Sequence, residues 1–160
     1  MSASISDLVQ ALAAVCDRQG LRVAVAESCT GGGLAAAITE RPGVSSFFLG
    51  GIVSYANEVK VALLGVPESV LETEGAVSEA TARAMATGVR ARMRADVGIG
   101  ITGIAGPSGA TPTKPVGLVY IGVATPMETR VRRHVWPGDR LSIRQASIQA
   151  ALELTVEMLR

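Results

Sequence analysis

Aromatic side chains are scarce in this chain: Phe, Trp and Tyr together make up 3% of its 160 residues. The hydrophobic fraction is nevertheless 48%, so any core must be built from Ala, Val, Ile and Leu. This length favours one domain, residues 1–160, that is large enough to bury its core without disulfides or metal ions. The 18 glycines lie between apolar runs rather than in one tract, which indicates tight turns instead of disorder.

Cysteine, histidine and net charge are also in short supply. Cys16 and Cys29 are the two cysteines, too few for a disulfide framework, and this favours a reducing compartment. The formal net charge is +1, which is no basic surplus, so we expect no nucleic-acid partner. We interpret the arginines of segment 130–144 as a solvated face. His134 is the sole histidine and no Cys/Asp cluster has ligand spacing, so we predict no metal site.

Long apolar runs are missing as well. No stretch approaches the roughly 18 apolar residues of a membrane span. The N-terminus lacks the basic and apolar regions of a secretory signal. We therefore expect a soluble, cytoplasmic protein with no membrane partner.

Helical and extended patterns alternate along the chain, which predicts an α/β fold. A hairpin near Pro126 joins the last two strands and requires one antiparallel pair, so we expect a mixed sheet. Helices are predicted over 5–19, 34–41, 57–64, 67–74, 78–94 and 141–159. Strands are predicted over 21–25, 47–55, 96–102, 116–124 and 129–136.

Reactive side chains follow three of these strands. Ser28 and Cys29 lie in a turn that leads through three glycines into a helix, Lys60 and Tyr55 follow the second strand, and Thr102 ends the third. Because ligands bind at the carboxyl ends of strands in open α/β sheets, these groups are expected to meet. A serine and a buried, neutral lysine are the nucleophile and the base of a serine–lysine hydrolase.

Each of these residues also has a structural explanation. Ser28 can serve as a helix N-cap. The glycines that follow it in the turn can instead bind a phosphate through their backbone amides. Lys60 has the spacing of a surface lysine on an amphipathic turn. Tyr55 can be a half-buried packing residue, and Thr102 can satisfy a backbone group.

Five segments in order resemble the C-terminal domain of the CinA family, whose stand-alone members are nicotinamide-nucleotide amidases. They are AESCTGG at 26–32, SYANEVK at 54–60, GAVSE at 75–79, GIAGPSG at 103–109 with KPVG at 114–117, and PGDR at 137–140. Longer CinA proteins carry a further domain similar to molybdopterin-binding enzymes, which 160 residues are too few to hold. We therefore expect only the amidase domain here.

The resemblance implies a three-layer α/β/α domain with a mixed, mostly parallel sheet, often a homodimer. It also implies deamidation of nicotinamide mononucleotide to nicotinate mononucleotide and ammonia, without a metal or organic cofactor. The family's catalytic residues correspond to Ser28, Lys60, Tyr55 and Thr102. The residues expected to bind substrate are Glu27, Cys29, Thr30, Gly31, Gly32, Asn57, Gly103, Ala105, Gly106 and Arg140.

In this hypothesis Lys60 takes the proton of Ser28, and amides at the start of the 30–38 helix hold the oxyanion. The phosphate is expected on the 103–109 loop or on Arg140. Three alternatives stay open. Cys29 can be the nucleophile with Lys60 and Glu27, the domain can bind a nucleotide without turnover, or it can bind a partner in competence or DNA damage.

Overall fold

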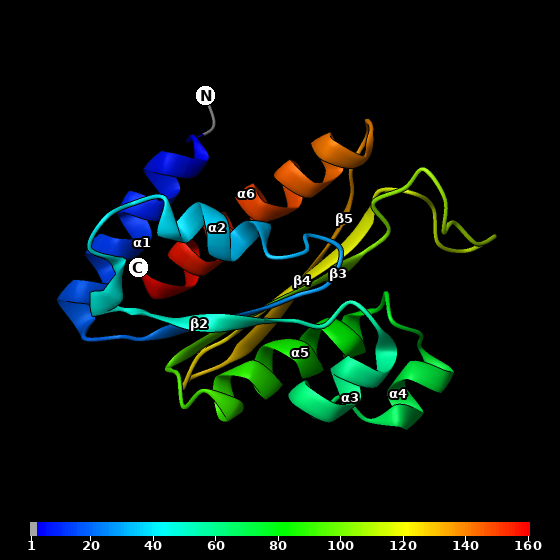
Figure 1. Cartoon of the computed structure of the whole chain (residues 1–160), viewed down its shortest axis with the longest axis horizontal. Helices are drawn as coiled ribbons and strands as arrows, with labels where there is room; N and C mark the ends of the chain where they lie inside the picture. The colour runs from blue at the N-terminus through cyan, green and yellow to red at the C-terminus, as the bar shows by residue number, and fades with distance from the viewer. Residues whose placement is uncertain (1–2) are drawn as a thin grey trace.

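The computed structural model describes residues 3–160 as three layers, with one sheet between two groups of helices (Figure 1). The helices on one face are α1 (Ile5–Gln19), α2 (Gly33–Thr39) and α6 (Arg140–Leu159). Those on the other are α3 (Asn57–Leu64), α4 (Glu68–Thr73) and α5 (Glu79–Arg92). The α/β/α architecture predicted from the sequence is confirmed.

The sheet has five strands in the order β2-β1-β3-β4-β5. The strands are β1 (Val23–Glu27), β2 (Phe48–Val53), β3 (Val97–Gly103), β4 (Leu118–Ala124) and β5 (Thr129–Val135). β1 is parallel to both β2 and β3. The chain passes from β1 to β2 on one side and then crosses to β3 on the other, so the strand order reverses at β1.

Local signals set the helix ends. Ser4 and Asp7 form a capping box at the start of α1, and Gly20 ends that helix in the left-handed conformation. Ser78 and Asp139 cap α5 and α6 through their side-chain oxygens. These ends agree with the predicted ones to within a few residues.

Aliphatic side chains form most of the core, and Phe47 is the buried aromatic residue among them. The larger cluster packs α1, α2 and α6 on the sheet with aliphatic side chains such as Leu12, Ile99 and Leu152, all fully buried. On the other face α5 lies directly on the strands. A Cβ atom at Gly100 would come within 2.8 Å of the Ala86 amide nitrogen. Close approach of backbones therefore provides the packing that large rings provide elsewhere.

The sheet departs from the prediction in one respect. Two pairs are antiparallel, β3–β4 and β4–β5, where the sequence predicted one. The 104–117 connection contains no helix to carry the chain back across the sheet, so β4 returns beside β3 in the opposite direction. A 3₁₀ turn at Val44–Ser46 was also not predicted.

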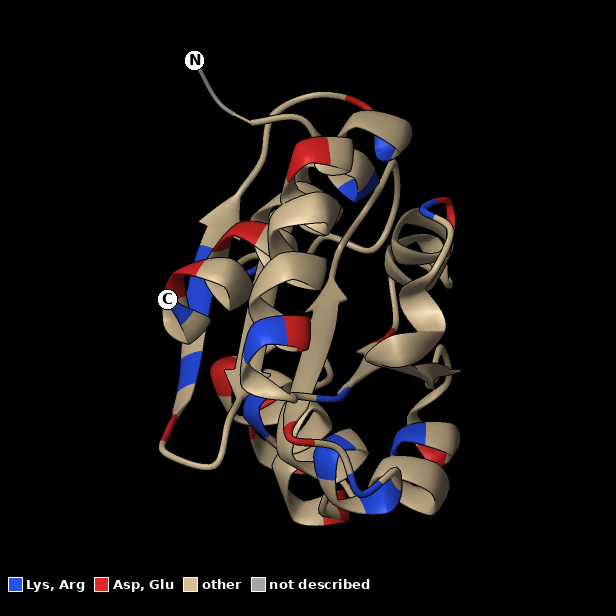
Figure 2. Ribbon diagram, turned by 90° about the vertical axis from the view of Figure 1, so that its left-hand side faces the viewer, with Lys and Arg blue, Asp and Glu red and all other residues tan. Residues whose placement is uncertain are grey.

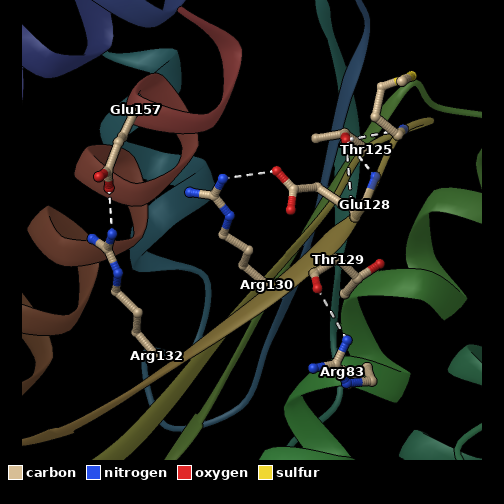
Figure 3. A network of polar contacts seen from close by, with 8 residues as sticks. Arg83, Thr125, Glu128, Thr129, Arg130, Arg132 and Glu157 are labelled. Atoms are coloured by element: carbon tan, nitrogen blue, oxygen red, sulfur yellow. Dashed lines mark hydrogen bonds and ion pairs between the residues drawn. The ribbon is translucent and has the colours of Figure 1, made fainter.

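Acidic and basic residues alternate along the elements of the ribbon in Figure 2. On β5, Arg130 pairs with Glu128 at 2.9 Å and Arg132 pairs with Glu157 of α6 (Figure 3). The arginine-rich strand is thus partly neutralised by acids, in keeping with a solvated face. Within residues 3–160, no helix is both long enough and apolar enough to cross a bilayer.

Candidate active site

A cleft of about 270 Å³ opens at the carboxyl ends of β1 and β3, where the strand order reverses. This is the position at which open α/β sheets bind ligands. Ser28 directly follows β1, Thr102 lies near the end of β3, and Lys60 reaches in from α3. The cleft is lined by Ser28, Cys29, Tyr55, Lys60, Ala76, Val77, Thr102, Gly103, Ile104, Ala105, Gly106, Ser108, Gly109 and Arg140.

Lys60 and Ser28 are brought together at the base of this cleft. The Lys60 Nζ atom lies 3.1 Å from Ser28 Oγ. It also donates to the backbone oxygens of Ser54 at 2.7 Å and Tyr55 at 3.0 Å. Only 1% of Lys60 is exposed, although it belongs to the first turn of a surface helix. The helix therefore delivers its lysine inward, over the end of β2.

Burial is the main electrostatic influence on this lysine. Desolvation lowers the pKa of Lys60, and the nearby Cys29 opposes the shift. No carboxylate forms an ion pair with Lys60 in the described part of the chain. A lysine in such a setting is more easily neutral than one in water, as a general base must be.

Glu27 was expected to bind substrate, but its side chain instead binds backbone amides of α2. Its carboxylate accepts hydrogen bonds from the amides of Leu34 at 2.8 Å and Ala35 at 3.0 Å. The side chain is 1% exposed and is not part of the cleft lining. Glu27 therefore caps α2, and it ties the nucleophile turn to that helix.

Because Glu27 caps α2, the amides expected to hold the oxyanion are already hydrogen-bonded. Leu34 and Ala35 are amides at the start of α2, and both already donate to a carboxylate. The amides of Gly31 and Gly33 are likewise used, by Ser28 O and Thr30 O within the turn. The expectation that the helix start supplies the oxyanion donors is wrong for these amides, because a buried anion competes for them.

Cys29 lines the cleft beside Ser28 but lies in a different environment. It is 5% exposed and belongs to the apolar cluster between α2, α6 and the sheet. Burial raises the pKa of Cys29 to about 11, and nearby Arg144 lowers it by less. Because the thiolate is the reactive form, this environment works against cysteine as a nucleophile. Cys16 is also a free, buried thiol.

Tyr55 and Thr102 face the cleft from opposite sides. Tyr55 is 63% exposed, and its backbone oxygen, rather than its ring, contacts Lys60. Thr102 is buried and donates its hydroxyl hydrogen to Ala76 O at 2.7 Å. That bond fixes the turn between α4 and α5, which forms a wall of the cleft.

The 103–109 loop and Arg140 form the outer part of the cleft, as the sequence placed them. Arg140 donates through Nη1 to Gly106 O at 2.8 Å and holds the loop against the start of α6. The other residues expected to bind substrate do not line the cleft. Asn57 lies on the outer surface of α3, and the remaining three belong to the turn behind the nucleophile: Thr30, Gly31 and Gly32.

Several lining residues were not predicted as site residues. Ala76 and Val77 belong to the GAVSE segment, and Ile104, Ser108 and Gly109 belong to GIAGPSG. Both segments were among the five that resemble the family. Membership of these segments was therefore the sequence signal that could have identified the five residues as site residues. Arg144 carries no such signal, yet its Nη2 donates to Thr30 O at 3.0 Å and supports the nucleophile turn from α6.

Acidic and thiol groups do not gather in a metal-binding arrangement. In the described range, no group of three or more His, Cys, Asp or Glu side chains is placed to hold a metal ion. The polar side chains that line the cleft are three aliphatic hydroxyls, a phenol, a thiol, an amine and a guanidinium, from Ser28, Thr102, Ser108, Tyr55, Cys29, Lys60 and Arg140.

The fold and the Ser28–Lys60 pair define an α/β/α domain with a buried hydroxyl–amine site. A family model described as the CinA C-terminal domain matches residues 5–159, so the chain belongs to that family. A CinA-like protein of Gemmatimonas aurantiaca is 50% identical over 147 residues, which cover 92% of this chain and 34% of that protein. The chain spans about a third of the length of such curated relatives.

Solved structures agree with this assignment over the whole fold. A competence/damage inducible protein from Agrobacterium tumefaciens is 38% identical, with a TM-score of 0.95 and coverage of 100% of both chains. A competence damage-inducible protein from Klebsiella pneumoniae is 32% identical, with a TM-score of 0.95 and 98% of both chains covered. The family predicted from the five sequence segments is confirmed.

Proposed function

We propose that this domain is an amidase that hydrolyses the carboxamide of nicotinamide mononucleotide through a Ser28–Lys60 pair. The observation that carries the proposal is the 3.1 Å contact between Ser28 Oγ and Lys60 Nζ in a buried setting. Resemblance to the stand-alone amidases of the CinA family supports the substrate. The products are nicotinate mononucleotide and ammonia.

The hydrogen-bond partners of Lys60 support its role as a base. A neutral amine has two hydrogens and one lone pair. Two of its three partners, Ser54 O and Tyr55 O, are carbonyl oxygens that can only accept. If Lys60 is neutral, both hydrogens point to these carbonyls and the lone pair is left for the Ser28 hydroxyl hydrogen. The backbone thereby directs the basic electron pair at the nucleophile.

The reaction then follows in balanced steps. Lys60 takes the Ser28 proton as Oγ bonds to the carboxamide carbon, whose electrophilicity the pyridinium ring increases. The resulting ammonium returns a proton to the amide nitrogen, and the C–N bond breaks to release ammonia. Water, deprotonated by Lys60, attacks the ester carbonyl and releases nicotinate mononucleotide. As the ester C–O bond breaks, the Lys60 ammonium returns this proton to Ser28 Oγ, which restores the Ser28 hydroxyl and the neutral amine.

The outer cleft suits the anionic end of this substrate. Arg140 is the one guanidinium among the described lining residues, and one of its nitrogens already holds Gly106 O. Its remaining N–H groups are suited to a phosphate. The phosphate would then lie at the mouth and the carboxamide at the Ser28 base of the cleft.

Thr102 has a smaller part in this proposal than the sequence suggested. Its hydroxyl hydrogen is engaged by Ala76 O, so relaying a proton would require that bond to break. The Tyr55 side chain is exposed at the cleft, where it can contact the substrate ring. Its backbone oxygen accepts a hydrogen bond from Lys60 and so orients the amine.

Separate alanine substitutions at Ser28 and Cys29 test the proposal. Ammonia release from nicotinamide mononucleotide is expected to fall by about 10³-fold or more in Ser28→Ala, as for other catalytic nucleophiles. Cys29→Ala is the matched control, because it changes the adjacent lining residue and leaves the Ser28–Lys60 contact in place. Activity retained in Ser28→Ala, or lost only in Cys29→Ala, would contradict the assignment.

The names of the related proteins refer to competence and damage rather than to a reaction. They suggest no ligand. The hydroxyl–amine pair favours the amidase over a purely binding domain.

A further inference from the structure

Lysine is rare in this chain, and one of its two lysines lies at the cleft while the other lines a neighbouring hollow that shares Val77 with it. Of the 15 basic side chains, 2 are lysines, Lys60 and Lys114, and the others are arginines. Lys60 forms the base of the cleft. Lys114 belongs to the KPVG segment, to which the proposed chemistry assigns no role. It lies in the 104–117 connection, whose first residues line the outer cleft.

Lys114 joins the 104–117 connection to the 74–77 turn, outside the cleft lining but next to it. Its Nζ donates to Glu74 O at 2.6 Å, and Glu74 directly follows α4. The ammonium also rests on the adjacent turn, since a Cβ atom at Gly75 would come within 2.9 Å of Nζ. Lys114 forms no ion pair within residues 3–160. The hydrogen bond to the Glu74 backbone oxygen is therefore the polar contact that the Lys114 side chain makes with the 74–77 turn.

The wall that Lys114 reaches is held by side chains at three consecutive carbonyls. Lys114 binds the oxygen of Glu74, Thr81 binds that of Gly75 at 2.7 Å, and Thr102 binds that of Ala76 at 2.7 Å. Two of these donors come from elements that also form the wall or the floor. Lys114 alone of the three comes from the opposite loop.

The rest of the KPVG segment places Lys114 for this contact. Thr111 and Lys114 exchange backbone hydrogen bonds and form a small turn. Val116 packs beneath Gly106, where a Cβ atom would come within 2.6 Å of its side chain. Gly117 donates to Ile104 O at 2.8 Å and closes the base of the loop. The loop is thus fixed at its base and is joined to the 74–77 turn by Lys114.

We propose that Lys114 is a positioning residue that holds the 104–117 loop against the 74–77 turn and so sets the width of the outer cleft. It touches neither Ser28 nor Lys60, and its effect is on the part of the cleft that would receive the phosphate end of the substrate. The kinetic part of this inference rests on the proposed amidase function; the contact itself does not.

Three variants test it. Lys114→Met keeps most of the aliphatic stem and removes the donors, Lys114→Arg keeps a donor, and Thr113→Ala is a matched control on the exposed neighbour. In Lys114→Met we expect KM for nicotinamide mononucleotide to rise about fivefold, the loss of one net hydrogen bond, with kcat within about twofold. Lys114→Arg should restore most of the loss, and Thr113→Ala should match the wild type.

Hydrogen exchange gives a readout that is independent of activity. Lys114→Met should speed amide exchange in residues 74–77 and 104–117, while residues 23–27 of the buried strand β1 stay protected. Unchanged exchange, a fall in kcat at constant KM, or no recovery in Lys114→Arg would overturn the inference. If the wild type releases no ammonia, the amidase proposal fails, and exchange alone decides whether Lys114 joins the loop to the turn.

Discussion

Lys60 Nζ lies 3.1 Å from Ser28 Oγ, and both side chains are buried at the base of one cleft. The two residues are 32 positions apart and come from different layers of the domain, the end of β1 and the first turn of α3. Their contact depends on β2 lying beside β1, because β2 delivers the chain into α3 at the same edge of the sheet.

The activity should depend on the neutral form of Lys60. Burial lowers the pKa of Lys60, so kcat/KM should rise about tenfold per pH unit on the acidic side and level off below the ordinary lysine pKa of about 10.4. Initial rates of ammonia release across pH 6 to 11 measure this. A rise that continued to about 11, the pKa of Cys29, would point to the thiolate instead.

The same shift makes stability depend on pH. The folded-state pKa of Lys60 is below the unfolded value, so the unfolded chain binds more protons between the two. Stability should therefore rise with pH in that window, by at most about 1.4 kcal/mol per pH unit for one group. Lys60→Met removes the titration, so urea unfolding of both proteins at several pH values should give a shallower dependence in the variant. Equal slopes would show that Lys60 is not shifted.

Glu27 should matter for the fold more than for chemistry. Glu27→Gln keeps one oxygen acceptor for the Leu34 and Ala35 amides but loses the other and the charge at the start of α2. We expect a loss of about 1–3 kcal/mol in the free energy of unfolding. Denaturant melts measure it, and the pH profile of activity should keep its midpoint. A displaced midpoint with unchanged stability would place Glu27 in the reaction.

Thr102 offers a test between a proton relay and a wall support. Thr102→Val removes the hydroxyl that donates to Ala76 O with little change of shape, at a cost of about 1 kcal/mol for the loss of a part-buried hydrogen bond. As a support, Thr102 should be replaceable by Ser, which keeps the donor. Thermal unfolding and kcat measured together decide the matter, because a relay would lower kcat in Thr102→Val far more than the loss of stability accounts for.

Much of the fold follows from local sequence. Ser4, Gly20 and Ser78 mark helix ends through their own hydrogen bonds or conformations, and such signals act over a few residues. The direction of β4 was predicted less well, because it depends on how the helix-free 104–117 segment returns rather than on any residue of the strand. Strand pairing is a relation between distant segments and leaves a weaker local trace.

The sequence alone determined the family, the alternation of helices and strands, and the residue types available at the strand ends. Those are properties of local pattern and of ordered motifs. Only the tertiary structure decided that Lys60 turns inward to Ser28, that the Glu27 carboxylate caps α2, and that Lys114 binds the backbone oxygen of Glu74. A side chain's partners depend on which segments the sheet and its crossovers bring within a few ångströms, and spacing along the chain does not specify that distance.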